Sequence, residues 1–289
     1  MESLSAAYRG PKRARAARTP TQVAAYLAYR APATYAAAEA AFAQVRVQRP
    51  DWRPHSLLDA GAGPGIATLA AIEQWPSLTS VRLVDVEPAM LAAGRVLLPD
   101  ATWEQGDVSS ARGPADLALA SYVLGELDDV ERAAAHLWDQ AADTVVFVEP
   151  GTPEGYRRVL AARAATIAAG GHTVAPCPHD LACPLVAPDW CHFAVRLPRS
   201  KLHRRAKAVE LGHEDEKFSY AALSREQVPK AQARVIRQPQ ARSGHVNLVT
   251  SELDGVHTRT VSRKQGGLYR EARGAAWGAA IDLGRTPPP

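Results

Sequence analysis

Hydrophobic and polar positions divide the chain into regions with different periodicities. Residues 20–47 are rich in alanine, with larger apolar side chains at helical spacing. This pattern predicts two helices separated at Ala31 and Pro32, because a proline disfavours helical conformation in the residue before it. We expect residues 1–50 to form an N-terminal helical cap. From residue 51 onward, short apolar runs alternate with helical stretches, which is typical of an α/β fold with a doubly wound sheet.

The strands predicted in this α/β region are short and apolar. They fall at residues 56–59, 80–84, 101–105, 116–121 and 143–149, with a helix at 156–169 and a last strand at 218–223. We therefore expect an α/β domain at residues 51–228 that carries a cysteine-rich insertion at 175–216.

Beyond residue 228 the pattern changes to strand-like alternation. It predicts strands at 233–237, 244–251 and 256–262, with a turn at Asp254 and Gly255 and a helix at 268–280. Residues 229–289 are thus expected to form a small basic C-terminal β module. Small β-barrels of the oligonucleotide-binding type use such surfaces.

A glycine-rich turn follows the first predicted strand. Asp59 closes the strand, and Gly61, Gly63 and Gly65 follow at alternate positions before an Ala- and Leu-rich helix. Glycine allows close approach of a ligand and positive φ, and the helix offers N–H groups to an anionic group. The G-x-G-x-G spacing differs from the dinucleotide fingerprint. It resembles the first motif of S-adenosylmethionine-dependent methyltransferases, in which the acidic residue lies near the amino-acid end of the cofactor. The alternative is a turn needed only for close strand–helix packing.

Further candidate cofactor contacts follow the later strands. Asp85, at the tip of the second strand, is the candidate for the ribose hydroxyls, with Glu87 close enough to compete. Met90 is a candidate apolar wall for adenine, although a buried Met is more often part of the core. Asp107 closes the third strand, and in this superfamily such an Asp typically meets the adenine amino group. The predicted cofactor set is Asp59, Gly61, Gly63, Gly65, Asp85, Met90 and Asp107.

The ends of the fourth and fifth strands are where methyltransferases place substrate-facing groups. Tyr122 and Glu149 are the candidate catalytic residues there. The Asn/Asp-Pro-Pro-Tyr/Phe signature of enzymes that methylate exocyclic base amines is absent from this stretch. So is the cysteine nucleophile that carbon-5 pyrimidine methylation requires. The sequence therefore does not predict the methyl acceptor.

All three cysteines of the chain, Cys177, Cys183 and Cys191, fall within one proline-containing segment. A cytosolic cysteine cluster is more often metal-binding or catalytic than a disulfide framework. The spacing is not that of a zinc knuckle, and thiolates in a proline-stiffened loop suit an iron–sulfur cluster, which normally takes four cysteines. The alternative is three unrelated buried thiols. Candidates for a fourth ligand are a hydroxyl, His179, His192 and His203.

Charge changes sign along the chain. Residues 1–50 carry 8 basic and 2 acidic side chains, residues 51–150 carry 5 and 16, and residues 151–289 carry 21 and 12. Basic flanks suit a polyanion such as RNA, although arginine on ordinary solvated faces gives the same counts. The densest basic run supplies the candidate RNA contacts Arg196, Arg199, Lys201, Arg204, Arg205 and Lys207.

The sequence also predicts where the protein is found. No apolar run reaches the 18 or more residues typical of a membrane span, and residues 1–30 lack the apolar segment of a signal peptide. We expect a soluble protein that does not contact a membrane. The Arg-rich start imitates an organellar presequence, but the Ala/Arg-rich composition favours the cytoplasm of a high-GC bacterium. We expect a monomer.

Five segments are informative together: the glycine loop at 57–65, residues 121–127, residues 148–155, the cysteine segment at 177–193 and residues 214–220. They resemble the methyltransferase-like proteins of the mitochondrial small ribosomal subunit and their bacterial relatives, from Tyr26 to Gly278. The resemblance implies a Rossmann-type methyltransferase domain that binds S-adenosylmethionine, and association with the small ribosomal subunit or its rRNA during assembly. It also implies a four-iron, four-sulfur cluster, with Cys177, Cys183 and Cys191 matching three of its ligands.

The chain departs from this family at the fourth cluster ligand. The family's fourth cysteine follows a Ser-Gly-His-Val segment, here residues 243–246, and the matching position is Ser251. No cysteine follows Cys191, so several alternatives stay open: a cluster completed by Ser251 or by a histidine, a three-iron cluster, a zinc site, or no metal. The missing ligand also predicts that the C-terminal module is held less tightly. Two functions stay open as well: a methyltransferase acting on small-subunit rRNA or a ribosomal protein, and a non-catalytic rRNA-binding assembly factor. A small-molecule methyltransferase is the third possibility.

Overall fold

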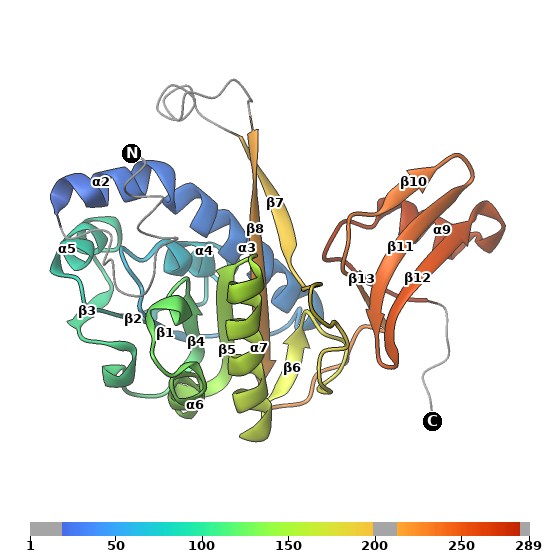
Figure 1. Cartoon of the computed structure of the whole chain (residues 1–289). Helices are drawn as coiled ribbons and strands as arrows, with labels where there is room; N and C mark the ends of the chain where they lie inside the picture. Colours follow the sequence, from blue (N-terminus) through green and yellow to red (C-terminus); the bar gives the residue numbers. More distant parts are fainter. Residues whose placement is uncertain (1–18, 199–212, 284–289) are drawn as a thin grey trace.

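The computed structural model describes residues 19–198 and 213–283, which form two β-sheets with packed helices (Figure 1). The larger sheet has the strand order β3-β2-β1-β4-β5-β8-β6, and β7 pairs with the first half of β8. Strands β1 to β5 are parallel, and β8 runs antiparallel to β5. Its strands are β1 Ser56–Ala60, β2 Ser80–Asp85, β3 Thr102–Gln105, β4 Ala115–Ser121, β5 Ala141–Pro150, β6 His172–Ala175, β7 Phe193–Pro198 and β8 His213–Ser224. This is the Rossmann-like methyltransferase sheet that the sequence predicted.

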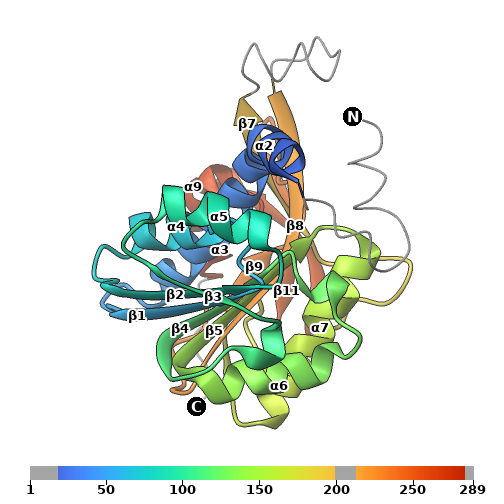
Figure 2. The same ribbon diagram turned by 90° about the vertical axis from the view of Figure 1, so that its left-hand side faces the viewer.

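Helices cover both faces of this sheet, as Figure 2 shows with α4 and α5 above the strands and α6 and α7 below them. Alternate strand residues point to opposite faces, so Leu57 packs with Phe42 of α3 while Leu58 packs with Trp138 of α6. Burial on both faces explains why the central strands β4 and β5 are nearly continuous apolar runs. The helices are α3 Ala31–Gln48, α4 Ile66–Gln74, α5 Pro88–Leu97, α6 Val130–Gln140 and α7 Pro153–Ala168, with short helices η1 Val108–Ser110 and η2 Leu124–Glu126.

The antiparallel part of the sheet differs from the prediction. All five parallel strands were predicted, and β8 is the last strand of this sheet along the chain, as expected. It begins at His213 instead of residue 218 and lies between β5 and β6. Strands β6 and β7 were not predicted. Their hydrogen bonds come from β8, which follows them in the chain, so their strand conformation depends on a later segment more than on their own pattern.

The N-terminal helices pack into the same core. Helix α2 covers Pro20–Tyr29 and begins with a capping box at Thr19. The break before α3 falls at Arg30, directly before the predicted position, and Pro32 lies in the first turn of α3, where its missing N–H is not needed. Phe42 of α3 is fully buried. The predicted domain boundaries at residues 50 and 228 stay predictions.

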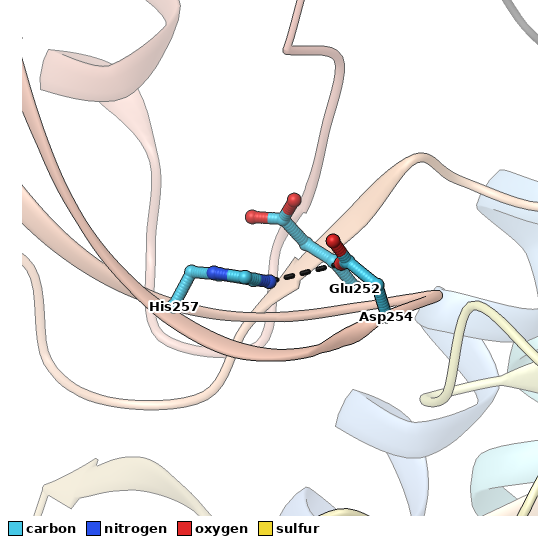
Figure 3. Close-up of side chains that lie close together, drawn as sticks. All are labelled: Glu252, Asp254 and His257. Carbon is cyan, nitrogen blue, oxygen red and sulfur yellow. Dashed lines mark hydrogen bonds and ion pairs between the residues drawn. The ribbon is translucent and has the colours of Figure 1, made fainter.

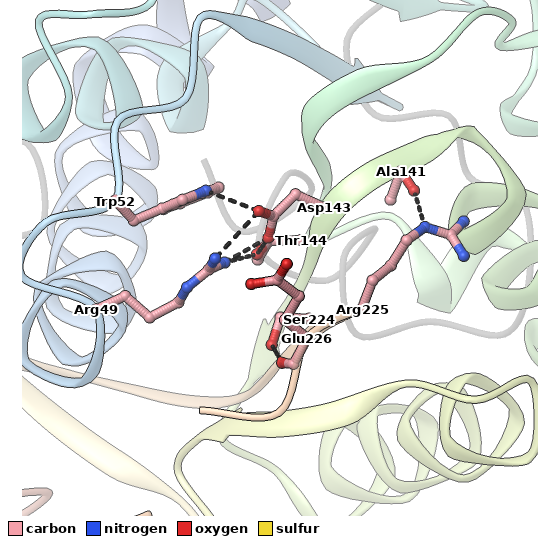
Figure 4. Close-up of polar contacts among 8 residues, drawn as sticks. All are labelled: Arg49, Trp52, Ala141, Asp143, Thr144, Ser224, Arg225 and Glu226. Carbon is pink, nitrogen blue, oxygen red and sulfur yellow. Dashed lines mark hydrogen bonds and ion pairs between the residues drawn. The ribbon is translucent and has the colours of Figure 1, made fainter. Parts of the chain in front are cut away.

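A polar network fastens the end of α3 to the sheet at the start of β5 (Figure 4). Arg49 donates to both carboxylate oxygens of Asp143, and Trp52 Nε1 donates to the same carboxylate at 3.1 Å. Partial burial opposes ionisation of Asp143, but these hydrogen bonds outweigh it and lower the pKa of the carboxyl group. Nearby, Arg225 Nε donates to the Ala141 carbonyl at 2.7 Å. The network lies at the edge of the sheet opposite to the glycine loop.

The smaller sheet is antiparallel, with the order β10-β11-β9-β13 and with β12 on the other side of β11. It has its own core, which includes Val246, Leu248 and Ala272. Within the described residues this sheet is open, since β12 pairs only with β11 and β13 pairs only with β9. The elements are β9 Ala233–Val235, β10 Gln240–Arg242, β11 His245–Glu252, β12 Gly255–Ser262, η3 Arg263–Gln265, α9 Gly267–Gly274 and β13 Ala280–Ile281.

The predicted helix at 268–280 is too long. Helix α9 ends at Gly274, and the residues that follow return to pair β13 with β9. Strand β10 was not predicted, because its three residues are all exposed and carry no apolar pattern. None of the helices in the described ranges has both the length and the hydropathy of a membrane span.

Candidate functional site

The glycine loop lies at the carboxyl edge of β1, and its three glycines have positive φ: 76° at Gly61, 56° at Gly63 and 81° at Gly65. A Cβ on Gly61 would lie 2.3 Å from Val123 Cγ2, whereas a Cβ on Gly63 would meet nothing within 4 Å. Gly61 is therefore required by packing, as the alternative interpretation held. Gly63 faces open space, as a cradle for a ligand requires.

Asp59 is fully buried directly before this loop. Its Oδ2 accepts a hydrogen bond from Thr68 Oγ1 of α4 at 2.6 Å, while its Oδ1 has no partner among the described residues. Burial raises the pKa of Asp59 to about 7. A buried oxygen without a donor is rare in folded proteins, so Asp59 has the capacity to accept a hydrogen bond or a cation from a ligand.

Asp85 connects the tip of β2 to the glycine loop. Its Oδ2 accepts from the Gly63 N–H at 2.7 Å, and its Oδ1 accepts from the Glu87 N–H at 2.8 Å. Burial raises the pKa of Asp85, and these two hydrogen bonds oppose the change. Glu87, the competing candidate, is the N-cap residue of α5. The structure thus brings Asp59, Gly63 and Asp85 together at one edge of the sheet.

Met90 and Asp107 lie farther along this edge. Met90 is buried in a small cluster with Val23 of α2, so part of its surface is core. Asp107 is exposed and caps η1, accepting from Ser109 Oγ at 2.6 Å, which lowers its pKa. Their adenine contacts stay predictions.

Sequence reasoning missed Tyr26 of α2 as a site residue. Burial raises the pKa of its phenol, while a hydrogen bond with Thr34 and the charge of Arg30 oppose the change. Its ring packs against the cluster of Val23 and Met90. In the sequence, only the helical spacing of Tyr26 with Val23 was informative. That spacing indicates that the side chain is buried, but it does not indicate which residues the side chain packs against.

The candidate catalytic residues lie at the ends of β4 and β5. Tyr122 has a φ of 59°, a strained conformation for an aromatic residue that is concentrated at functional sites. Its hydroxyl donates to Glu216 Oε1 of β8 at 3.0 Å, and Glu216 is paired with Arg30. Glu149 is buried, its Oε1 accepts from a backbone N–H of η2, and burial raises its pKa to about 8. Both side chains therefore have protein partners.

The loop between β6 and β7 carries all three cysteines, and in Figure 1 it lies between the two sheets. All three are free, partly buried thiols. Tyr156 of α7 donates to Cys183 Sγ at 3.1 Å. Burial raises the pKa of Cys191 well above its usual range, and the charges of Cys177 and Cys183 raise it further.

The C-terminal sheet is attached beside this loop. The buried guanidinium of Arg234 on β9 donates to the Pro176 carbonyl at 2.7 Å and to the Gly278 carbonyl at 2.9 Å. Ser251 pairs with Arg234 across β11 and β9, and such pairs place both side chains on one face of a sheet. Ser251 therefore lies on the same face of the module as Arg234. Arg234 in turn contacts Pro176, the residue before Cys177.

The candidate histidine ligands have other surroundings. His192 stacks on Trp190 and meets Trp277 edge-on, and His179 is buried, with its carbonyl accepting from Arg163. His203 lies outside the described residues.

One compact group of metal-ligand side chains does occur in the described chain, at the β11–β12 turn (Figure 3). It consists of Glu252, Asp254 and His257, whose ligand atoms lie within 4.8 Å of one another. His257 Nε2 lies 2.9 Å from Asp254, and Glu252 forms a salt bridge with Arg259. Since Glu252 is paired with Arg259 and Asp254 meets the His257 ring, we interpret these groups as polar contacts of the hairpin.

The predicted RNA contacts fall mostly outside the described residues. Arg196 on β7 forms an ion pair with Asp215 at 2.8 Å. Outside the described ranges lie Arg199, Lys201, Arg204, Arg205 and Lys207.

Comparison of the sequence with known proteins identifies a family and several relatives. The model of a family described as "Mitochondrial small ribosomal subunit Rsm22" matches residues 20–282. The human ribosome assembly protein METTL17, mitochondrial, is 28% identical over 89% of this chain and 62% of that protein. The Rsm22-cox11 tandem protein 2, mitochondrial, of Schizosaccharomyces pombe is 26% identical over 92% of this chain and 44% of that protein. The chain thus spans less than two thirds of these relatives.

A solved structure with a similar arrangement is magnesium protoporphyrin IX methyltransferase from Synechocystis with bound SAH. It has a TM-score of 0.45 and 11% identity, and the match covers 78% of this chain and 94% of that one.

Proposed function

The chain belongs to the family of the mitochondrial small ribosomal subunit protein Rsm22, and on that premise we propose that it binds the small ribosomal subunit or its rRNA during assembly. We also propose that it carries an S-adenosylmethionine site at the carboxyl edge of β1 and β2. The observation that carries the cofactor proposal is the open cradle at Gly63 beside the unpartnered Asp59 Oδ1. The ligand chemistry fits these residues, because the cofactor has an ammonium group for Asp59 and ribose hydroxyls for Asp85.

Bound there, the cofactor would supply a methyl group on a sulfonium. The chain would orient it: Asp59 accepts the ammonium group, Asp85 fixes the ribose while it holds the glycine loop, and Asp107 meets the adenine. Methyl transfer needs a positioned acceptor more than it needs a catalytic side chain. Tyr122 and Glu149 border the place where the acceptor would enter.

The second candidate function is a non-catalytic assembly factor that keeps this fold. A specific observation favours it. The hydroxyl of Tyr122 is committed to Glu216, and the carboxylate of Glu149 accepts a backbone N–H. The Tyr122 hydroxyl cannot take part in proton transfer without giving up its contact with Glu216.

Calorimetric titration with S-adenosylhomocysteine tests the site. We expect the wild-type chain to bind and Asp85→Ala to lose at least about tenfold in affinity, since ribose contacts and the Gly63 hydrogen bond disappear together. The matched control is Asp139→Ala, an exposed carboxylate on α6, which should bind like wild type. No binding by wild type would refute the cofactor proposal.

Co-sedimentation with purified small ribosomal subunits tests the partner. If Asp85→Ala still associates with subunits, and no methyl is transferred from labelled S-adenosylmethionine to them, the non-catalytic function is the correct one. Methylation of subunits by wild type and not by Asp85→Ala would establish the enzyme. Failure of wild type to associate would refute the partner.

We further propose that Cys177, Cys183 and Cys191 hold an iron–sulfur cluster. The support is the membership of the family and the spacing of the cysteines, which is not the two-residue spacing of a zinc knuckle. Thiolates in a proline-containing loop suit an iron–sulfur cluster. Ser251 is the proposed fourth ligand, from the face that carries Arg234.

Anaerobic purification with iron, sulfide and zinc analysis tests this site. We expect iron and sulfide with a visible charge-transfer band that Cys183→Ala abolishes, and Ser251→Ala should weaken the band if the hydroxyl is a ligand. Zinc without iron would contradict the cluster, and a metal-free wild type would contradict any metal site.

A further inference from the structure

The C-terminal module is strongly polarised in charge. At one end, Figure 1 shows the turn between β11 and β12, where Glu252 and Asp254 lie. At the other end lie the β10–β11 turn, η3 and α9. This second end carries five exposed cations, which we call the basic end: Arg242, Arg263, Lys264, Arg270 and Arg273.

Backbone contacts bring the segments of the basic end together. The Arg263 N–H donates to the Gly244 carbonyl at 3.0 Å, which joins η3 to the β10–β11 turn. Arg242 pairs with His245 at the same turn. Helix α9 begins at Gly267, directly after η3 and the N-cap residue Gly266, so η3 and α9 meet there.

Helix α9 turns its charges outward. Ala272 is fully buried against the module core. Arg270 and Arg273 are three residues apart, so they share one face of the helix, and both are exposed. Cations on two segments therefore face solvent from one end of the module.

Among the described residues, no carboxylate forms an ion pair with the cations of the basic end. Elsewhere in the module, Arg237 pairs with Asp189 and Arg259 with Glu252. In the described part of the chain none of the five forms an ion pair, and the one acidic residue of α9, Glu271, accepts from the Asp282 N–H. A group of unneutralised cations attracts a polyanion by releasing its counterions.

We propose that the basic end binds the phosphate backbone of RNA without reading its sequence. This inference rests on the proposed function, since the RNA would be that of the small subunit, and it names a contact surface separate from residues 196–207. An anionic membrane fits less well, because a membrane-binding surface adds apolar anchors to its cations. The exposed large apolar residues of the module, Leu253 and Val256, lie at the opposite end.

The test compares two quadruple variants of the full chain. One replaces the cations of η3 and α9: Arg263→Gln, Lys264→Gln, Arg270→Gln and Arg273→Gln. The other removes the same charge from exposed positions of the Rossmann-like domain: Arg46→Gln, Arg53→Gln, Arg95→Gln and Arg132→Gln. Affinity for a short fluorescein-labelled single-stranded RNA of mixed sequence is measured by anisotropy between about 50 and 200 mM KCl.

We expect the first variant to bind at least about tenfold more weakly, with the slope of log affinity against log salt smaller by about 3, since each lost phosphate contact removes about 0.7 on a single strand. The control variant should keep most of the affinity. Equal losses in both variants, or no loss in the first, would overturn the proposal. If the first variant is less stable in a thermal melt, Arg270→Gln with Arg273→Gln gives the same test with about half the change in slope.

Small-subunit co-sedimentation separates this proposal from the broader function. If the first variant associates with small subunits as the wild type does, with an unchanged salt dependence, the basic end is not an RNA-binding surface. The proposed ribosomal function would still stand. Vesicles of anionic phospholipid provide the last comparison. Binding of wild type to vesicles but not to the RNA would overturn the proposal in favour of a membrane.

Discussion

Replacing Asp59 by asparagine should stabilise the fold and weaken cofactor binding at once. Burial raises the pKa of this carboxyl group from 3.8 to about 7. Each tenfold change in proton affinity corresponds to about 1.4 kcal/mol, so ionised Asp59 lowers the free energy of unfolding by about 4 kcal/mol above pH 7. Asparagine keeps an acceptor for Thr68 but buries an amide N–H₂ without a partner, which costs about 1–3 kcal/mol. The net gain is about 1–3 kcal/mol at pH 8.

The sign of the pH dependence is the sharper part of this prediction. The pKa of Asp59 is higher in the folded state than in the unfolded state. The contribution of Asp59 to the free energy of unfolding is therefore fully present below about pH 4 and is lost as the pH rises to about 7. The advantage of Asp59→Asn should therefore disappear near pH 5.

Urea unfolding followed by tryptophan fluorescence at pH 5 and pH 8 measures the difference, with an unchanged m-value as the sign that the unfolded state is the same. The control is Asp116→Asn, because Asp116 at the opposite edge of the sheet already accepts the N–H groups of His55 and Ser56 and its replacement should bring no gain. If Asp59→Asn were less stable than wild type at pH 8, or equally changed at both pH values, the reasoning would be refuted. The same variant should lose affinity for S-adenosylhomocysteine.

Three further changes probe the packing around the sites. Gly61→Ala places a Cβ 2.3 Å from a methyl group of Val123 at a φ of 76°, so urea unfolding should show a loss of at least about 2 kcal/mol. Arg49→Met should cost about 2 kcal/mol at neutral pH. Since the pKa of Asp143 is lowered in the folded state, that difference should vanish as pH falls below about 4. Arg234→Leu removes the contacts with the Pro176 and Gly278 carbonyls, and limited proteolysis should then release the C-terminal module faster while the Rossmann-like core stays protected.

The local parts of the candidate site were predictable from the sequence. The positions of Asp59, Gly63 and Asp85 follow from strand ends, because the carboxyl ends of parallel strands meet at one edge of a sheet. The cysteine site stays a prediction, which rests on the position of all three cysteines in one loop. Tyr26 was not predictable, since α2 reaches this edge only by packing on α5 around Met90.

Sequence alone indicated the five parallel strands, the glycine loop and the loop that carries the cysteines, because short apolar runs, glycine spacing and cysteine positions are local patterns. Tertiary structure decided the rest. Strand β6 forms only where β8 is present to pair with it, and β13 only where β9 returns beside it. Likewise, the attachment of the C-terminal module depends on Arg234, whose partner carbonyls lie 58 and 44 residues away. No local pattern of hydrophobic and polar residues encodes such distant hydrogen-bond partners.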